Sequence, residues 1–150
     1  MESSMINSRK LEDLNPIVSS MCDNFIVTCK SHGIDVLITS TLRDNESQNA
    51  LYAQGRTAPG KIVTNAKGGQ SYHNYGVAFD FVPLVNGKAM WDDLDLYKKC
   101  GEIAESVGLE WAGRWQGKLR ETAHCQFTNG LHWSDLQAGK TIGGENVGKT

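Results

Sequence analysis

The chain has 150 residues, a formal net charge of −2 and a sequence pI near 6.1. This length is that of about one domain, and it allows a hydrophobic core that needs no disulfide bonds. Hydrophobic residues make up 39% and charged residues 21% of the sequence, as in soluble globular proteins. A weakly acidic protein has no global positive field, so we expect no nucleic-acid partner. We expect a monomer without stable membrane association.

The N-terminal segment 1–10 is polar and lacks the apolar stretch of a signal peptide, and no run of about 18 apolar residues follows it. We therefore expect synthesis in the cytoplasm. The cysteines form no CxxC motif, and thiols of a cytoplasmic protein stay free and are usually buried. They are Cys22, Cys29, Cys100 and Cys125.

The first third of the chain predicts a helix, a strand and a short helix. Apolar residues at three- and four-residue steps predict a helix over about 9–31: Leu11, Leu14, Val18, Met21, Phe25 and Cys29. The β-branched segment 34–40 predicts a strand. Asn45, with Gln48 three residues later, is expected to cap a short helix that Gly55 ends.

Residues 55–72 contain Gly, Pro, Asn and Lys without a lasting period, which predicts a long loop, and long loops in compact domains are usually functional or disordered. Beyond Gly76, large apolar residues alternate with other residues over 77–82, which predicts a strand. In this strand Asp80 points to the face opposite Phe79 and Phe81.

The remaining elements indicate an α+β fold. Asn86-Gly87 predicts a turn, and a second long helix is expected from Asp92 or Asp93 to Gly108. Strands are expected at 109–116 and 123–128. A brief helix and a loose tail are expected from Ser134 on, because apolar residues become scarce there.

Five residues have the chemistry of a catalytic zinc site, which requires three His or carboxylate ligands and a further carboxylate that moves protons. His73, Asp80 and His124 are candidate ligands, Glu121 is a candidate general base, and Arg43 is a candidate oxyanion donor. Spacing alone leaves other interpretations open, because a single histidine is more often a structural or surface residue.

The odd spacing of His73 and Asp80 places them on opposite faces of any continuous strand, but Gly76 allows the chain to turn between them. Glu121 lies three residues before His124 at the start of the last predicted strand, so a small bend brings both into one site. Cys125 points to the other face of that strand and is expected in the core.

The motif S-x-H-x-x-G-x-A-x-D at residues 71–80, followed by E-x-x-H at 121–124, resembles the zinc peptidase family of D-Ala-D-Ala carboxypeptidases and L-alanyl-D-glutamate endopeptidases. The segments from Arg43 through 51–56 to 70–76 are especially similar to the phage endolysins of that family. The resemblance covers about residues 10–128. It implies a small antiparallel sheet flanked by helices, as in the D-Ala-D-Ala carboxypeptidase and hedgehog-like fold.

The resemblance further implies one Zn²⁺ per chain, held by His73, Asp80 and His124, with Glu121 as general base and Arg43 at the substrate carbonyl. Ser71 is expected to support the His73 ligand and to lie near the substrate. The implied partner is the peptidoglycan stem peptide, and the implied reaction is hydrolysis of its L-Ala–D-Glu bond. An endolysin of this kind is expected to reach the cell wall through a membrane pore.

Two alternative functions remain: a D-Ala-D-Ala carboxypeptidase of the same family, and a non-catalytic binding domain with a structural zinc. We expect a catalytic domain at residues 1–133, a short flexible tail at 134–150 and no separate wall-binding domain. The tail 143–150 matches the phosphate-binding P-loop pattern, but that motif requires a helix after it. We interpret the match as a chance occurrence.

Overall fold

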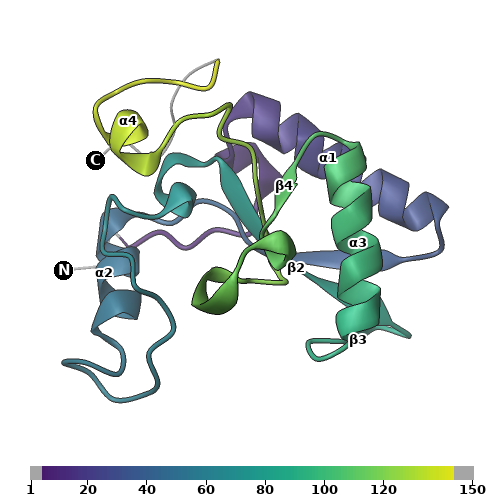
Figure 1. Cartoon of the computed structure of the whole chain (residues 1–150), viewed down its shortest axis with the longest axis horizontal. Coiled ribbons are helices and arrows are strands. Elements are labelled where there is room, and N and C mark those ends of the chain that lie inside the picture. Colours follow the sequence, from purple (N-terminus) through teal and green to yellow (C-terminus); the bar gives the residue numbers. More distant parts are fainter. Residues whose placement is uncertain (1–4, 144–150) are drawn as a thin grey trace.

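A computed structural model describes residues 5–143, except for the side chain of Lys118 (Figure 1). Its centre is an antiparallel sheet with the strand order β1-β2-β5-β4, and β3 pairs with the end of β2. The strands are β1 (Asp35–Ser40), β2 (Ala78–Val85), β3 (Lys88–Ala89), β4 (Glu110–Trp111) and β5 (His124–Gln126).

Two long helices, α1 (Pro16–Ser31) and α3 (Leu94–Ser106), cover one face of the sheet. The aromatic rings of this face are in direct contact: Phe25 of α1 lies 5.0 Å from Phe81 of β2, and Tyr97 of α3 lies 5.3 Å from Phe81. Each of these rings is buried and therefore contributes roughly 1.5–3 kcal/mol through removal of apolar surface from water. The sheet and these two helices form the hydrophobic core.

The two short helices lie on the side of the molecule away from α3 in Figure 1. The helix α2 (Asn45–Ala53) and the loop that follows it extend on the left of Figure 1, and α4 (Trp133–Gln137) lies above them. Single 3₁₀ turns connect the elements: η1 (Leu11–Asp13), η2 (Tyr72–Tyr75), η3 (Ala112–Arg114) and η4 (Gly117–Leu119). The predicted α+β fold with a small antiparallel sheet flanked by helices is confirmed.

The predicted helix over 9–31 begins too early, because α1 starts only at Pro16. The side chain of Asn15 accepts a hydrogen bond from the Ile17 amide at 2.9 Å and caps the helix. Proline favours the first helical position and disfavours helical geometry in the residue before it. The Asn-Pro pair was therefore a start signal that the apolar periodicity concealed.

The predicted strand 109–116 is wrong beyond Trp111, where the chain turns into η3. The Trp111 ring lies so close to Gly113 that a Cβ there would come within 2.1 Å of it. The same ring leaves no room for a Cβ at Gly101 of α3. The chain thus folds around this indole. The strand predicted at 123–128 is also shorter, since β5 covers only His124–Gln126.

Several local predictions are confirmed. Asn86 and Gly87 both have positive φ and form the β2–β3 turn, and Asp93 caps α3 through the Leu96 amide. The short helix α2 is present, although Asp44 rather than Asn45 caps it, by accepting from the Ser47 amide at 2.8 Å.

All four cysteines are buried and free. Within 134–143, Leu136 and Ile142 are buried in the core, so this stretch packs against the domain. The P-loop-like pattern lies outside the described residues except for Gly143. None of the helices in the described part of the chain combines the length and the hydrophobicity that crossing a membrane requires.

Candidate metal centre

Asp80 and His124 lie directly opposite each other on neighbouring strands. They are register partners in β2 and β5, so their side chains leave the sheet on the same face. The adjacent pair, Phe79 and Cys125, faces the core on the other side and is fully buried. Strand alternation therefore separates the polar face from the core, as predicted for Asp80 and Cys125.

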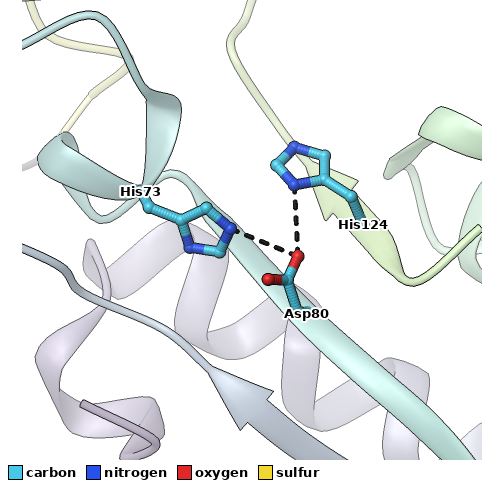
Figure 2. A group of neighbouring side chains, drawn as sticks. All are labelled: His73, Asp80 and His124. Carbon is cyan, nitrogen blue, oxygen red and sulfur yellow. Dashed lines mark hydrogen bonds and ion pairs between the residues drawn. The ribbon is translucent and has the colours of Figure 1, made fainter. Parts of the chain in front are cut away.

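His73 reaches the same place from η2, outside the sheet (Figure 2). The Ser71 hydroxyl caps this turn by accepting a hydrogen bond from the His73 amide at 3.2 Å. Gly76 ends the turn in the left-handed conformation, with φ of 68°, which L-residues rarely adopt. The chain then enters β2, so the predicted turn between His73 and Asp80 is present.

Figure 2 shows the three side chains converging on one point. The Oδ1 atom of Asp80 lies 3.2 Å from Nε2 of His73 and 3.3 Å from Nδ1 of His124, and these three atoms lie within 4.8 Å of one another. In a tetrahedral zinc site with bonds of about 2.0–2.2 Å, ligand atoms are roughly 3.3–3.6 Å apart. The two distances to Asp80 and the donor types therefore fit Zn²⁺.

Hydrogen bonds to the outer ring nitrogens fix how the histidines face this point. Nδ1 of His73 donates to the Thr41 carbonyl at 2.8 Å, and Nε2 of His124 donates to the Gln126 amide oxygen at 2.8 Å. In the neutral imidazoles the inner nitrogens are then lone-pair donors that face a carboxylate. Only added protons or a cation can make that arrangement favourable.

The electrostatics of the site follow from this crowding. Burial by itself would raise the pKa of Asp80, but His73 and His124 lower it far below its ordinary range. Burial by itself would lower the pKa of His124, but its hydrogen bond to Asp80 and the charges of Asp80 and Glu121 raise it overall. The carboxylate is thus held in the charged form, as a metal ligand must be.

Arg43 lies beside Asp80, and Glu121 lies beside His124. Nη2 of Arg43 is 3.9 Å from Oδ2 of Asp80, and the Arg43 side chain is only 11% exposed. The Glu121 side chain is 55% exposed, and its Oε2 atom is 4.0 Å from Nδ1 of His124. The structure thus brings together all five residues that the sequence singled out.

The centre lies in an open cleft of about 810 Å³. One wall comes from the 62–66 part of the long loop, which includes the exposed side chain of Ile62, and another comes from Trp115 and the exposed Leu119. Trp133 also lines the cleft, whereas His132 caps α4 through the Ser134 amide. Part of the long loop therefore lines the candidate site.

Sequence reasoning missed three side chains that support the site. Gln48 accepts a hydrogen bond from Nη1 of Arg43 at 2.9 Å. Gln126 holds His124, and Glu110 in turn accepts from the Gln126 amide at 3.2 Å. The alternation of β5 could have indicated Gln126, because residues two apart share a face.

The sequence is similar to two curated peptidases. It is 42% identical over 124 residues to the peptidoglycan L-alanyl-D-glutamate endopeptidase CwlK of Bacillus subtilis, covering 77% of this chain and 74% of that protein. It is 32% identical over 126 residues to the L-alanyl-D-glutamate peptidase of Listeria phage A118, covering 80% of this chain but only 41% of the phage protein. The chain thus spans less than half of the phage relative.

The fold is similar to that of the vancomycin-resistance D,D-pentapeptidase VanY, solved as a variant in complex with Zn(II). The TM-score is 0.58 at 12% identity, with 85% of this chain and 80% of that chain covered. A family model described as D-alanyl-D-alanine carboxypeptidase matches residues 64–127, from the cleft loop through β5. Together with the 42% identity to CwlK, these likenesses make the chain a peptidase of the zinc-dependent family of D-Ala-D-Ala carboxypeptidases and L-alanyl-D-glutamate endopeptidases.

Proposed function

We propose that this protein is a zinc-dependent peptidoglycan peptidase that hydrolyses the L-Ala–D-Glu bond of the stem peptide. The observation that carries the proposal is the convergence of His73, Asp80 and His124 in an open cleft. The choice of bond rests on the two curated relatives, both of which are named for this specificity. One of these relatives comes from a phage, and we further propose that the enzyme reaches the wall after release through a membrane pore.

In this proposal, Nε2 of His73, the carboxylate of Asp80 and Nδ1 of His124 hold one Zn²⁺. When bound there, zinc polarises a carbonyl group and lowers the pKa of a water molecule to about 7. Among the described residues, this metal-binding group comprises three side chains, so a tetrahedral zinc ion held by them would keep one coordination position open. A catalytic site requires that open position, whereas a structural zinc site fills it with a fourth protein ligand.

Glu121 is the proposed general base. Its side chain is half exposed in the cleft and lies near His124 without belonging to the ligand group. It takes a proton from the attacking water and returns it to the amine that leaves. A positioned carboxylate of this kind contributes about 10²–10⁴-fold to the rate.

Arg43 is the proposed donor to the substrate carbonyl and its developing negative charge. Ser40 and Gln48 hold its guanidinium by accepting from Nη2 at 3.0 Å and from Nη1 at 2.9 Å. Its Nε atom has no hydrogen-bond partner in the described structure. Ser71 lines the cleft next to His73 and is proposed as a substrate contact besides its capping role.

A second candidate function is a D-Ala-D-Ala carboxypeptidase, because the matching family model carries that description. Digestion of purified peptidoglycan and identification of the new termini separate the two reactions. New N-terminal D-Glu supports the endopeptidase. Released free D-Ala with the stem peptide still attached to the glycan contradicts it.

The same digest tests Glu121 with the variant Glu121→Gln. We expect this variant to bind zinc like the wild type and to lose at least about 10²-fold in rate. The control is Glu12→Gln, which makes the same change at an exposed position outside the cleft. If Glu121→Gln kept full activity, another residue would be the base. A wild type that binds zinc but cleaves no peptidoglycan would instead indicate a binding domain with a structural zinc site.

A further inference from the structure

A line of side chains leads from His124 away from the metal centre along the sheet. Nε2 of His124 donates to Oε1 of Gln126 at 2.8 Å, and Nε2 of Gln126 donates to Oε1 of Glu110 at 3.2 Å. The indole Nε1 of Trp115 donates to Oε2 of Glu110 at 2.7 Å. The Trp115 ring itself lies beside the metal centre, with its centroid 5.6 Å from that of the His124 ring.

Secondary structure places these groups together. His124 and Gln126 are two residues apart in β5 and therefore share a face. Glu110 of β4 is the register partner of Gln126, so the two side chains are neighbours on that face. Gln126 is 4% exposed, so its amide has to find its partners within the protein.

The chemistry of each group fixes the direction of every hydrogen bond in this line. A carboxylate only accepts and an indole N–H only donates. Glu110 therefore requires the NH₂ group of Gln126 on its side, which turns the amide oxygen of Gln126 toward His124. That oxygen requires a proton on Nε2 of His124, and the lone pair of the neutral ring is then on Nδ1, the nitrogen that faces Asp80.

The tautomer of His73 is fixed in a different way. Its outer nitrogen donates to the backbone carbonyl of Thr41, which can only accept. The amide of Gln126 can instead present either its oxygen or its NH₂ group to His124. The tautomer of His124 thus depends on a side chain that could turn around.

We propose that Glu110, acting through Gln126 and held by Trp115, is a positioning residue that fixes the metal-binding tautomer of His124. This inference rests on the proposed function, because it assigns the control of one proposed zinc ligand. Residues that orient metal ligands in this way typically change metal affinity or activity by 10–100-fold when replaced.

The variant Glu110→Gln replaces a carboxylate, which only accepts hydrogen bonds, with an amide that both accepts and donates. If the new amide turns its oxygen to the Trp115 indole, its NH₂ group faces Gln126 and favours the wrong orientation of that amide. If it turns the other way, its NH₂ group opposes the indole N–H. The first orientation reverses the tautomer of His124, and the second keeps it only at the cost of two opposed donors, so the tautomer is no longer enforced. Glu110 is exposed, so the variant is expected to fold.

The first test reads the tautomer directly by ¹⁵N–¹H correlation NMR of the metal-free protein, at a pH above the histidine titration. We expect His124 of the wild type to carry its proton on Nε2. In Glu110→Gln we expect a substantial Nδ1-protonated population. The control Glu105→Gln changes another exposed carboxylate, which pairs with Arg114 and belongs to α3 on the core side of the sheet, and it should match the wild type.

The second test measures zinc affinity by competition with a chelating indicator. We expect Glu110→Gln to bind zinc about 10–100-fold more weakly, and we expect a smaller loss for Trp115→Phe, which leaves the Glu110 carboxylate to accept from Gln126. The double variant should recover most of the loss, because without the indole N–H the new amide can turn its oxygen toward Gln126.

Three results would overturn the proposal: an unchanged tautomer in Glu110→Gln, a zinc affinity equal to that of Glu105→Gln, or a loss that Trp115→Phe does not relieve. Failure of the proposed function is a different outcome. In that case the wild type itself binds no zinc, and the NMR measurement on the metal-free protein still decides whether Glu110 controls His124.

Discussion

The variant Gln48→Leu tests whether α2 holds Arg43 in place. Gln48 is 1% exposed, and its amide joins two parts of the site. It accepts from Nη1 of Arg43 at 2.9 Å and donates to the Ala66 carbonyl in the cleft wall at 2.8 Å. A hydrogen bond to a charged group contributes about 1.5–3 kcal/mol and a neutral one about 0.5–1.5 kcal/mol. We therefore expect a loss of roughly 2–4 kcal/mol in the free energy of unfolding.

Urea unfolding measures this loss, and peptidoglycan digestion measures its effect on kcat. Loss of kcat should stay below about 10²–10³-fold, the usual effect of deleting an oxyanion donor, because Arg43 itself remains. Gln48→Glu should keep the contact to Arg43 but not the one to Ala66, since a carboxylate cannot donate. Gln137→Leu, at an exposed position of α4, is the control. Stability and kcat equal to that control would refute the reasoning.

Three further variants test the fold and the cleft. Gly101→Ala should cost about 1–3 kcal/mol in the free energy of unfolding through overpacking, because its Cβ would lie 2.1 Å from the Trp111 ring. The additional change Trp111→Leu should relieve part of that cost. Thermal unfolding of both variants measures the difference. Asn15→Ala should lower the free energy of unfolding by about 0.5–2 kcal/mol through loss of the α1 cap. Asn15→Ser, which can still cap the helix, should keep most of the wild-type stability. Urea titration measures both variants. Ile62→Ser should raise KM for wall fragments, because Ile62 is 58% exposed and lines the cleft. Its free energy of unfolding should stay within about 0.5 kcal/mol of the wild-type value. An unchanged KM would show that Ile62 does not contact the substrate.

The parts of the fold that the sequence predicted are those that depend on local patterns. Alternation over 77–82 correctly placed Asp80 opposite Phe79 and Phe81, and Asn86-Gly87 marked the hairpin. The start of α1 was misplaced because apolar periodicity continues through a segment that is not α-helical. The fold of 109–116 depends on packing around Trp111, which only the tertiary structure supplies.

The candidate site likewise has a part that the sequence predicted and a part that it did not. His73, Asp80 and His124 were found because their motif is short and specific, and the structure brings them together. Glu110 was missed because its partner Gln126 is distant in sequence. Gln126 meets Glu110 only through the pairing of β5 with β4, and no spacing in the sequence encodes that register.

The central claim is that His73, Asp80 and His124 hold a catalytic zinc ion. The most direct test is elemental analysis of freshly purified protein, combined with lysis of outer-membrane-stripped cells with and without a chelator. The account predicts about one zinc per chain, with lysis abolished by the chelator and restored by added zinc. Asp80→Ala should lose both the metal and the lysis, whereas Asp92→Ala, at an exposed position before α3, should keep both. Wild-type protein without metal, or lysis that is indifferent to the chelator, would contradict the account.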